Sequence, residues 1–241
     1  MALGEVARAA LIAKGRLVYG GHLDRDGYTA FLIHECERYG SRDRPFTGFV
    51  AWSEHAHLTA DAILDLRGQI GMLGQYVYLD VDGNVIEHPE SERDNTDPVD
   101  VDTTIRSLTA LRQRMTNETD ARVVLGGQRD GYKGRIPGVI EETTLSIQAG
   151  QPVFVAGGFG GAAGDVATAL GVDPEGWLGL PDRVGSPELV ELQDAASDAR
   201  WEVTRNGLTL EQNRQLAISY RASEIASLVV VGLTNLGAPD D

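Results

Sequence analysis

Apolar residues along this chain fall into two alternating patterns. Short, nearly continuous apolar runs are typical of buried strands, whereas stretches with an apolar residue every three or four positions are typical of amphipathic helices. The runs predict strands over residues 16–19, 48–52, 76–79, 85–86, 121–125 and 152–156. The helical spacing predicts helices over residues 3–14, 101–117, 139–149, 186–200, 209–220 and 222–235. It also predicts a helix that begins at residue 26 or 29 and ends at 39, and one that follows a glycine-rich turn and ends at 170. Residues 80–84 predict a tight turn that joins two of the strands into a hairpin.

Strands that are separated by helices predict βαβ units and a mainly parallel, Rossmann-like sheet with helices on both faces. The predicted fold class is therefore α/β. We expect residues 1–175 to form the ligand-binding domain. Residues 176–241 are expected to form a helical extension that packs on this domain or makes an oligomer interface.

Charge narrows the range of partners. The 241 residues carry a formal net charge of −15, which argues against a protein that binds nucleic acid through its phosphates. No apolar run approaches the length of a membrane span, so no membrane partner is expected. The single cysteine, Cys36, excludes an internal disulfide and fits a reducing, cytoplasmic compartment. Of the 21 basic residues, only Lys14 and Lys133 are lysines.

Three predicted strands run directly into glycines, and these positions are candidates for a ligand site. In a parallel sheet, ligands bind at the carboxyl ends of the strands, where glycine lets the backbone approach closely and point its amides at an anion. The candidate residues at these turns are Gly20, Gly21, His22, Gly126, Gly127, Gly157, Gly158 and Phe159. Phe159 either stacks on a base or packs into the core. Ser53, in the polar cluster after another strand, is a further candidate.

The segment 126–138 carries the strongest signal, with five glycines in thirteen residues. Its cations Arg129 and Lys133, its glycines Gly134 and Gly138, and the start of the next helix together favour an anion such as phosphate. Glu141 and Glu142 follow at once. They either bind ribose hydroxyls or a cationic sugar, or simply suit the first turn of a helix.

Two stretches resemble a known family. Residues 11–21 are similar to the segment that leads from the first helix into a strand and its glycine turn in LOG-type phosphoribohydrolases, and residues 137–141 resemble the second LOG motif. Both belong to the SLOG superfamily of Rossmann-like domains. The resemblance, over about residues 3–170, implies either cleavage of nucleotide N-glycosidic bonds or sensing of nucleotide-derived signals. The sensing domains bind NAD-like ligands and cyclic ADP-ribose isomers in bacterial antiviral defence, with a fused or associated effector.

Departures from the LOG pattern favour the sensor. The enzymes carry a Gly-Thr pair where this chain has Pro137 and Gly138, so the hydroxyl that would hold phosphate is absent. The family's first strand has no counterpart before residue 3, and the alternatives here are a truncated chain, another element in that place of the sheet, or a different alignment. We therefore expect binding of a nucleotide-derived ligand. The alternatives are a LOG-like or deoxyribosyltransferase-like enzyme, with Glu141 or Glu142 as catalytic carboxylate, and a scaffold that binds nothing.

Two further expectations concern metals and assembly. His55 and His57 have the spacing of some metal sites, but zinc needs one or two more ligands, so neither a metal nor a cofactor is predicted. Residues 218–236 supply more apolar surface than one small domain needs for its core. This surplus predicts a homodimer or a higher homo-oligomer.

Overall fold

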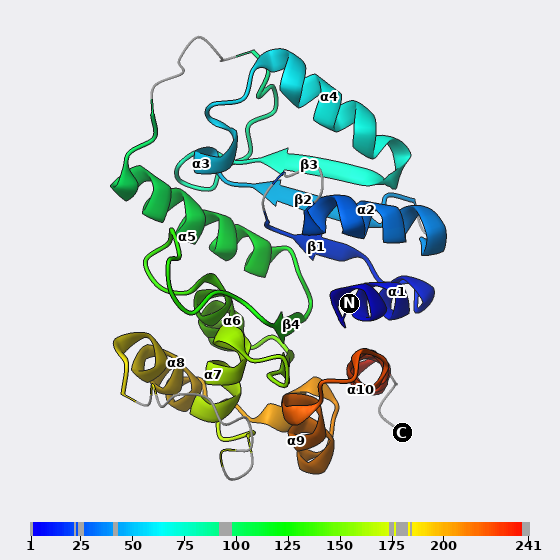
Figure 1. The fold of residues 1–241 in the computed structure, drawn as a ribbon, viewed down its shortest axis with the longest axis vertical. Coiled ribbons are helices and arrows are strands. Elements are labelled where there is room, and N and C mark those ends of the chain that lie inside the picture. The colour runs from blue at the N-terminus through cyan, green and yellow to red at the C-terminus, as the bar shows by residue number, and fades with distance from the viewer. Residues whose placement is uncertain are drawn as a thin grey trace. The chain divides into compact units, whose positions relative to one another are not determined.

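The computed structural model describes residues 2–21, 23, 27–40, 43–91, 98–173, 176, 183 and 185–237. The chain divides into two compact units. The N-terminal unit comprises Ala7–Met115 with Lys133–Arg135, and the C-terminal unit comprises Met1–Val6, Thr116–Tyr132 and Ile136–Asp241. Figure 1 labels the helices α1 to α10 and the strands β1 to β4.

The N-terminal unit is built on a three-stranded parallel sheet (Figure 1). Its strands β1 (Leu17–Tyr19), β2 (Phe46–Val50) and β3 (Gly74–Tyr78) lie in chain order, with Gly48 of β2 between Tyr19 and Tyr76. The helices of this unit are α2 (Tyr28–Tyr39), α3 (Trp52–His55), α4 (Ala60–Ile70), the 3-10 turn η1 (Gly71–Leu73) and nearly all of α5 (Val101–Asn117). Helix α1 (Ala2–Ile12) belongs to it from Ala7 onward.

Both faces of this sheet are covered, as the alternation along β2 shows. Successive side chains of a strand point to opposite faces. Phe49 packs in a cluster with Leu111 and Met115 of α5, whereas the next residue, Val50, packs in a second cluster with Ile63 of α4. Helices α4 and α5 therefore cover opposite faces, which is the arrangement of a buried parallel sheet in α/β proteins.

The C-terminal unit contains a second parallel pair, β4 (Arg122–Leu125) and β5 (Val153–Ala156). Its helices are α6 (Gly138–Gln148), α7 (Gly161–Ala169), α8 (Pro187–Asp198), the 3-10 turn η3 (Val203–Asn206), α9 (Leu210–Ile218) and α10 (Ala222–Leu236). Leu192 of α8 and Ala217 of α9 are in one buried cluster with Val124 and Val155 of the strands. Helices α8 and α9 thus share a core with β4 and β5.

A buried amide network fixes the last helices to the strand core. The Asn206 side chain donates to the Val153 carbonyl at 2.9 Å and to Asn213 Oδ1 at 2.8 Å. Ile225, Leu228 and Val229 of α10, which motivated the expectation of an oligomer, are buried within the chain itself. The helices that the structure describes include none with the length and apolarity needed to cross a membrane.

The predicted α/β class with parallel strands is confirmed, and five predicted strands are found within a few residues of their expected bounds. The predicted tight turn at residues 80–84 is found. The returning chain pairs with the end of β3 through an antiparallel bridge between Leu79 and Val85, and the Ile86 amide donates to the Tyr78 carbonyl at 2.9 Å. Residues 85–86 do not form a regular strand, so the hairpin is shorter than predicted. The Asp80 carboxylate closes this turn by accepting hydrogen bonds from the Asp82 and Asn84 amides at 2.8 and 2.9 Å, so the turn needs no second strand.

Candidate functional site

A pocket of about 330 Å³ lies in the N-terminal unit. Five of its seven lining residues are polar, namely one lysine, one glutamate, one histidine, one serine and one threonine. The lining residues are Ser53, Glu54, His57, Pro98, Val99, Thr104 and Lys133. Because Ser53 and Glu54 follow β2 by only a few residues, the pocket lies where ligands bind in open α/β sheets, at the carboxyl end of a strand.

His55 anchors the short helix α3 that carries Ser53 and Glu54. Its ring is fully buried, with Nε2 2.8 Å from the Leu79 carbonyl oxygen, and it packs edge-on against the rings of Trp52 and Tyr78. This contact ties α3 to the chain that follows β3. The buried imidazole thus holds the pocket wall in place, which is a different role from the metal ligation that the spacing of His55 and His57 suggested.

The start of α5 contributes another part of the lining, Thr104. The Asp100 carboxylate caps this helix by accepting from the Thr103 amide at 2.7 Å and from the Thr103 hydroxyl at 3.0 Å. These hydrogen bonds lower the pKa of Asp100 below its ordinary value. Thr104 Oγ1 donates to the Asp100 carbonyl at 2.9 Å, which leaves the oxygen able to accept from a ligand.

Charge inside the pocket is concentrated in one ion pair. Lys133 Nζ lies 3.3 Å from Glu54 Oε1, and the lysine side chain is 62% exposed whereas the glutamate is only 17% exposed. Ser53 Oγ is buried and has no hydrogen-bond partner among the described residues. A buried hydroxyl without a partner is destabilising, so Ser53 adds an unsatisfied polar group to the pocket wall.

The glycine turns after β4 and β5 contact each other within the C-terminal unit. The first amides of α7 donate to these glycines, from Ala162 to the Gly127 carbonyl at 3.1 Å and from Ala163 to the Gly126 carbonyl at 2.8 Å. Gly126 and Gly127 have φ of 63° and 88°, a region that favours glycine. The first amides of α7 and the carbonyls of Gly126 and Gly127 are therefore used within the fold.

The turn after β5 also contains Gly157, Gly158 and Phe159, of which the two glycines contact backbone and the phenylalanine is exposed. The Gly157 carbonyl accepts from Gly160 at 2.7 Å. Gly158 lies against the backbone of Ser219, and a β-carbon there would collide with the Ser219 carbonyl oxygen. Phe159 is 49% exposed, so its ring is accessible as the stacking prediction requires.

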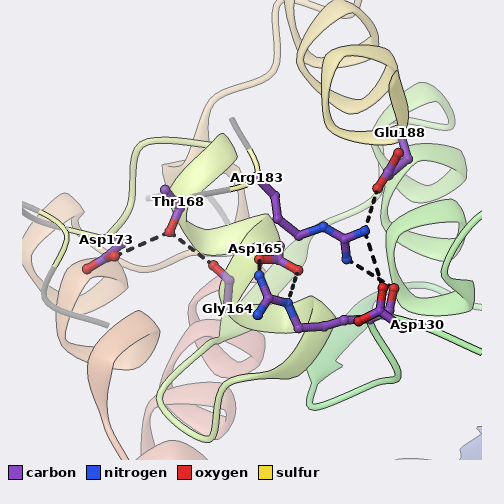
Figure 2. Close-up of polar contacts among 8 residues, drawn as sticks. Asp130, Gly164, Asp165, Thr168, Asp173, Arg183 and Glu188 are labelled. Atoms are coloured by element: carbon purple, nitrogen blue, oxygen red, sulfur yellow. Dashed lines mark hydrogen bonds and ion pairs between the residues drawn. The ribbon is translucent and has the colours of Figure 1, made fainter. Parts of the chain in front are cut away.

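Arg129 is held by an internal carboxylate. Its Nε and Nη2 each lie 2.8 Å from an oxygen of Asp165, which is 4% exposed. Figure 2 shows a second guanidinium nearby, that of Arg183, between Asp130 and Glu188 at 3.7 and 3.4 Å. Arg183 also donates to the Arg129 carbonyl at 3.0 Å, so this network fixes the loop after β4 to the start of α8.

The two candidate catalytic glutamates are on α6 of the C-terminal unit. Glu141 is buried, and its amide donates to the Pro137 carbonyl at 3.1 Å as the helix begins at Gly138. Glu142 forms an ion pair with Arg122 at 3.2 Å. Both carboxylates thus lie on a helix of that unit's core, at its first turns.

The turn after β1 packs against α5. A β-carbon on Gly20 would overlap the Met115 sulfur, and one on Gly21 would overlap the Tyr19 ring. Close packing against Met115 explains why position 20 is a glycine, and a ligand is not needed to explain it. The candidate His22 lies outside the described residues.

Of the predicted site residues, the structure thus brings Ser53 and Lys133 to one pocket, where buried Gly134 follows Lys133 directly. The analysis of the sequence did not assign Glu54 or Thr104 to the site. Glu54 had one available signal, its position next to Ser53 at the end of a strand. Its pairing with Lys133, 79 residues further along the chain, depends on the fold.

A parallel α/β fold with a polar pocket at a strand's carboxyl end is the architecture of a small-ligand-binding domain. The chain belongs to the family described as SLOG cluster2, whose family model matches residues 1–216. No curated protein and no solved structure matches the chain.

Proposed function

We propose that this chain binds a nucleotide-derived small ligand, NAD-like or cyclic ADP-ribose-like, in the pocket of its N-terminal unit. The observation that carries the proposal is the pairing of Lys133 with Glu54 in a pocket that Ser53 and Thr104 also line. An ammonium suits phosphate oxygens, and a carboxylate with hydroxyls suits ribose. A volume of about 330 Å³ is within the range of small-molecule sites.

Membership of SLOG cluster2 supports a nucleotide-related ligand. The resemblance to SLOG sensors further suggests a signalling role in bacterial defence, in which ligand binding would act on a fused or associated effector.

The proposal is tested by calorimetric titration with AMP, NAD and cyclic ADP-ribose isomers. Lys133→Ala should weaken a confirmed anionic ligand by roughly 1.5–3 kcal/mol, the range for hydrogen bonds to charged groups. Stability should change little because Lys133 is mostly exposed. Lys14→Ala, at the other lysine, is the matched control and should bind normally. Absence of binding by every nucleotide would favour the scaffold alternative.

A second candidate function, cleavage of an N-glycosidic bond, is favoured by one observation. Glu54 places a largely buried carboxylate in the same pocket, and a carboxylate next to the anomeric carbon stabilises an oxocarbenium-like transition state. Chromatography of each ligand after incubation separates the two functions. Release of free base that Glu54→Gln abolishes would establish the enzyme, whereas recovery of intact ligand supports a sensor.

A further inference from the structure

We propose that Asp130 is a modification site, at which the bond to Gly131 rearranges spontaneously to isoaspartate. The fold protects the other described pairs in which glycine follows an aspartate or an asparagine. The site lies in the glycine-rich loop after β4, between Arg129 and Lys133. Asp26, which also precedes a glycine, lies outside the described residues. This modification does not depend on the proposed function.

The rearrangement needs only water. The Gly131 backbone nitrogen attacks Cγ of the protonated Asp130 carboxyl group and forms a succinimide ring, while the amide proton and the carboxyl hydroxyl leave together as water. Water then adds to one of the two ring carbonyls. Opening at the side-chain carbonyl restores aspartate, whereas opening at the main-chain carbonyl gives isoaspartate and lengthens the main chain by one carbon. A following glycine favours the attack because it has no β-carbon that hinders the nitrogen.

Both reacting groups of this pair are accessible. The Asp130 side chain is 88% exposed, and its contact with Arg183 is long, at 3.7 Å, and shared with Glu188 (Figure 2). Gly131 has a φ of 70°, and a β-carbon there would meet no atom within 4 Å. Within the described part of the chain, the Gly131 amide donates no hydrogen bond. Neither the carboxyl group nor the nitrogen must therefore give up a strong contact before the ring closes.

The pair Asp82 and Gly83 has the same sequence but is held in place. The Asp82 carboxylate forms an ion pair with Arg106. The Gly83 amide donates to the Asp80 carbonyl at 3.2 Å, and a β-carbon on Gly83 would lie 3.1 Å from the Ala110 carbonyl oxygen. The nitrogen must break its hydrogen bond before it can attack, so the fold slows the reaction at this pair.

The pair Asn206 and Gly207 is protected by burial. In an unfolded chain it is the most reactive of the three, because ammonia leaves a side-chain amide more readily than water leaves a carboxyl group. In the fold, Asn206 is 1% exposed, and its side-chain nitrogen donates to the Val153 carbonyl and to Asn213 Oδ1. The Gly207 amide donates to the Thr204 carbonyl at 3.1 Å. The structure therefore reverses the order of reactivity that the sequence predicts.

The experiment uses the full chain after long incubation at neutral pH. Endoproteinase Asp-N cuts before aspartate but not before isoaspartate, so the uncut fraction at each position, measured by mass spectrometry, reports the modification. In the native protein this fraction should grow about two- to tenfold faster at Asp130 than at Asp82, the factor that one intact hydrogen bond contributes. Asn206, followed by the mass change of deamidation, should stay unmodified.

Two controls separate the fold from the local sequence. In urea, Asp82 should react as fast as Asp130, and Asn206 should become the fastest of the three. Gly131→Asn adds a β-carbon at a residue type that tolerates positive φ, and it should slow the reaction at Asp130 while Asp82 is unchanged. The proposal is overturned if native Asp130 forms no isoaspartate, if Asp82 reacts as fast in the native protein, or if Gly131→Asn has no effect.

Discussion

Lys133 and Arg129 are four residues apart in one glycine-rich loop, yet their side chains are held in different ways. The sequence suggested both as phosphate ligands. Arg129 makes two contacts of 2.8 Å with a buried carboxylate, whereas Lys133 makes one longer contact and is mostly exposed. Arg129 is therefore suited to stabilise the fold. The contact of Lys133 is weaker, so a ligand can bind this lysine with little loss of stability.

Replacing Arg129 should consequently affect stability more than binding. Arg129→Met leaves the Asp165 carboxylate buried without its partner, and we expect it to lower the free energy of unfolding by about 3 kcal/mol. Lys133→Met should lower it by less than about 0.5 kcal/mol. Urea unfolding followed by circular dichroism measures both. A normally stable Arg129→Met protein with weakened nucleotide binding would instead make Arg129 a ligand residue.

At the scale of elements, apolar runs located the strands because a strand buried on both faces is apolar along its whole length, as β5 is. Helix α4 was not predicted, since Asp61, Asp65 and Arg67 interrupt its apolar spacing. Its start is marked by Thr59, whose side chain accepts from the Ala62 amide at 3.2 Å. That capping residue was the available signal for α4.

The glycine turns show what such a signal can and cannot tell. A glycine pair after a strand correctly indicated close backbone approach, but the approaching partner is protein at several of these positions. The carbonyls of Gly126 and Gly127 accept hydrogen bonds from the first amides of α7, and Gly158 lies against the chain between α9 and α10. Which partner fills the space depends on contacts between residues distant in sequence, which the local pattern does not contain.

Gly158→Ala should therefore destabilise the protein whether or not a ligand binds nearby. The added methyl group would collide with the Ser219 carbonyl, and backbone cannot move aside as a flexible side chain can. We expect a loss of about 1–3 kcal/mol, typical of overpacking. Gly237→Ala, in the same unit and in ordinary contact with its neighbours, is the control and should be nearly neutral. Equal stability of the two variants in urea unfolding would contradict this packing role.

At the scale of the whole molecule, the homo-oligomer stays a prediction with a narrower motive. Ile225, Leu228 and Val229 are buried in their own chain, but Val231 and Leu236 of the same helix are 40% and 44% exposed. We expect light scattering at micromolar concentration to give at least a dimer mass, and Val231→Glu to lower it. A monomeric mass for the wild-type chain would contradict the prediction.

The net charge of −15 also has a consequence for ligand association. An acidic protein repels an approaching anion over the Debye length, which is about 30 Å at 0.01 M salt and about 8 Å at 0.15 M. The final contact with Lys133 is a short-range interaction and is screened much less. Salt should therefore weaken the long-range repulsion more than it weakens the attraction inside the pocket.

Raising the salt concentration from 0.01 to 0.15 M should accordingly speed association of a fluorescent AMP analogue by roughly two- to tenfold. This is opposite to the behaviour of proteins that attract anions through a basic surface. Stopped-flow fluorescence measures the rate, and the matching uncharged nucleoside, whose association should not depend on salt, is the control. Slower association at higher salt would mean that a local positive field outweighs the charge of the whole molecule along the ligand's path.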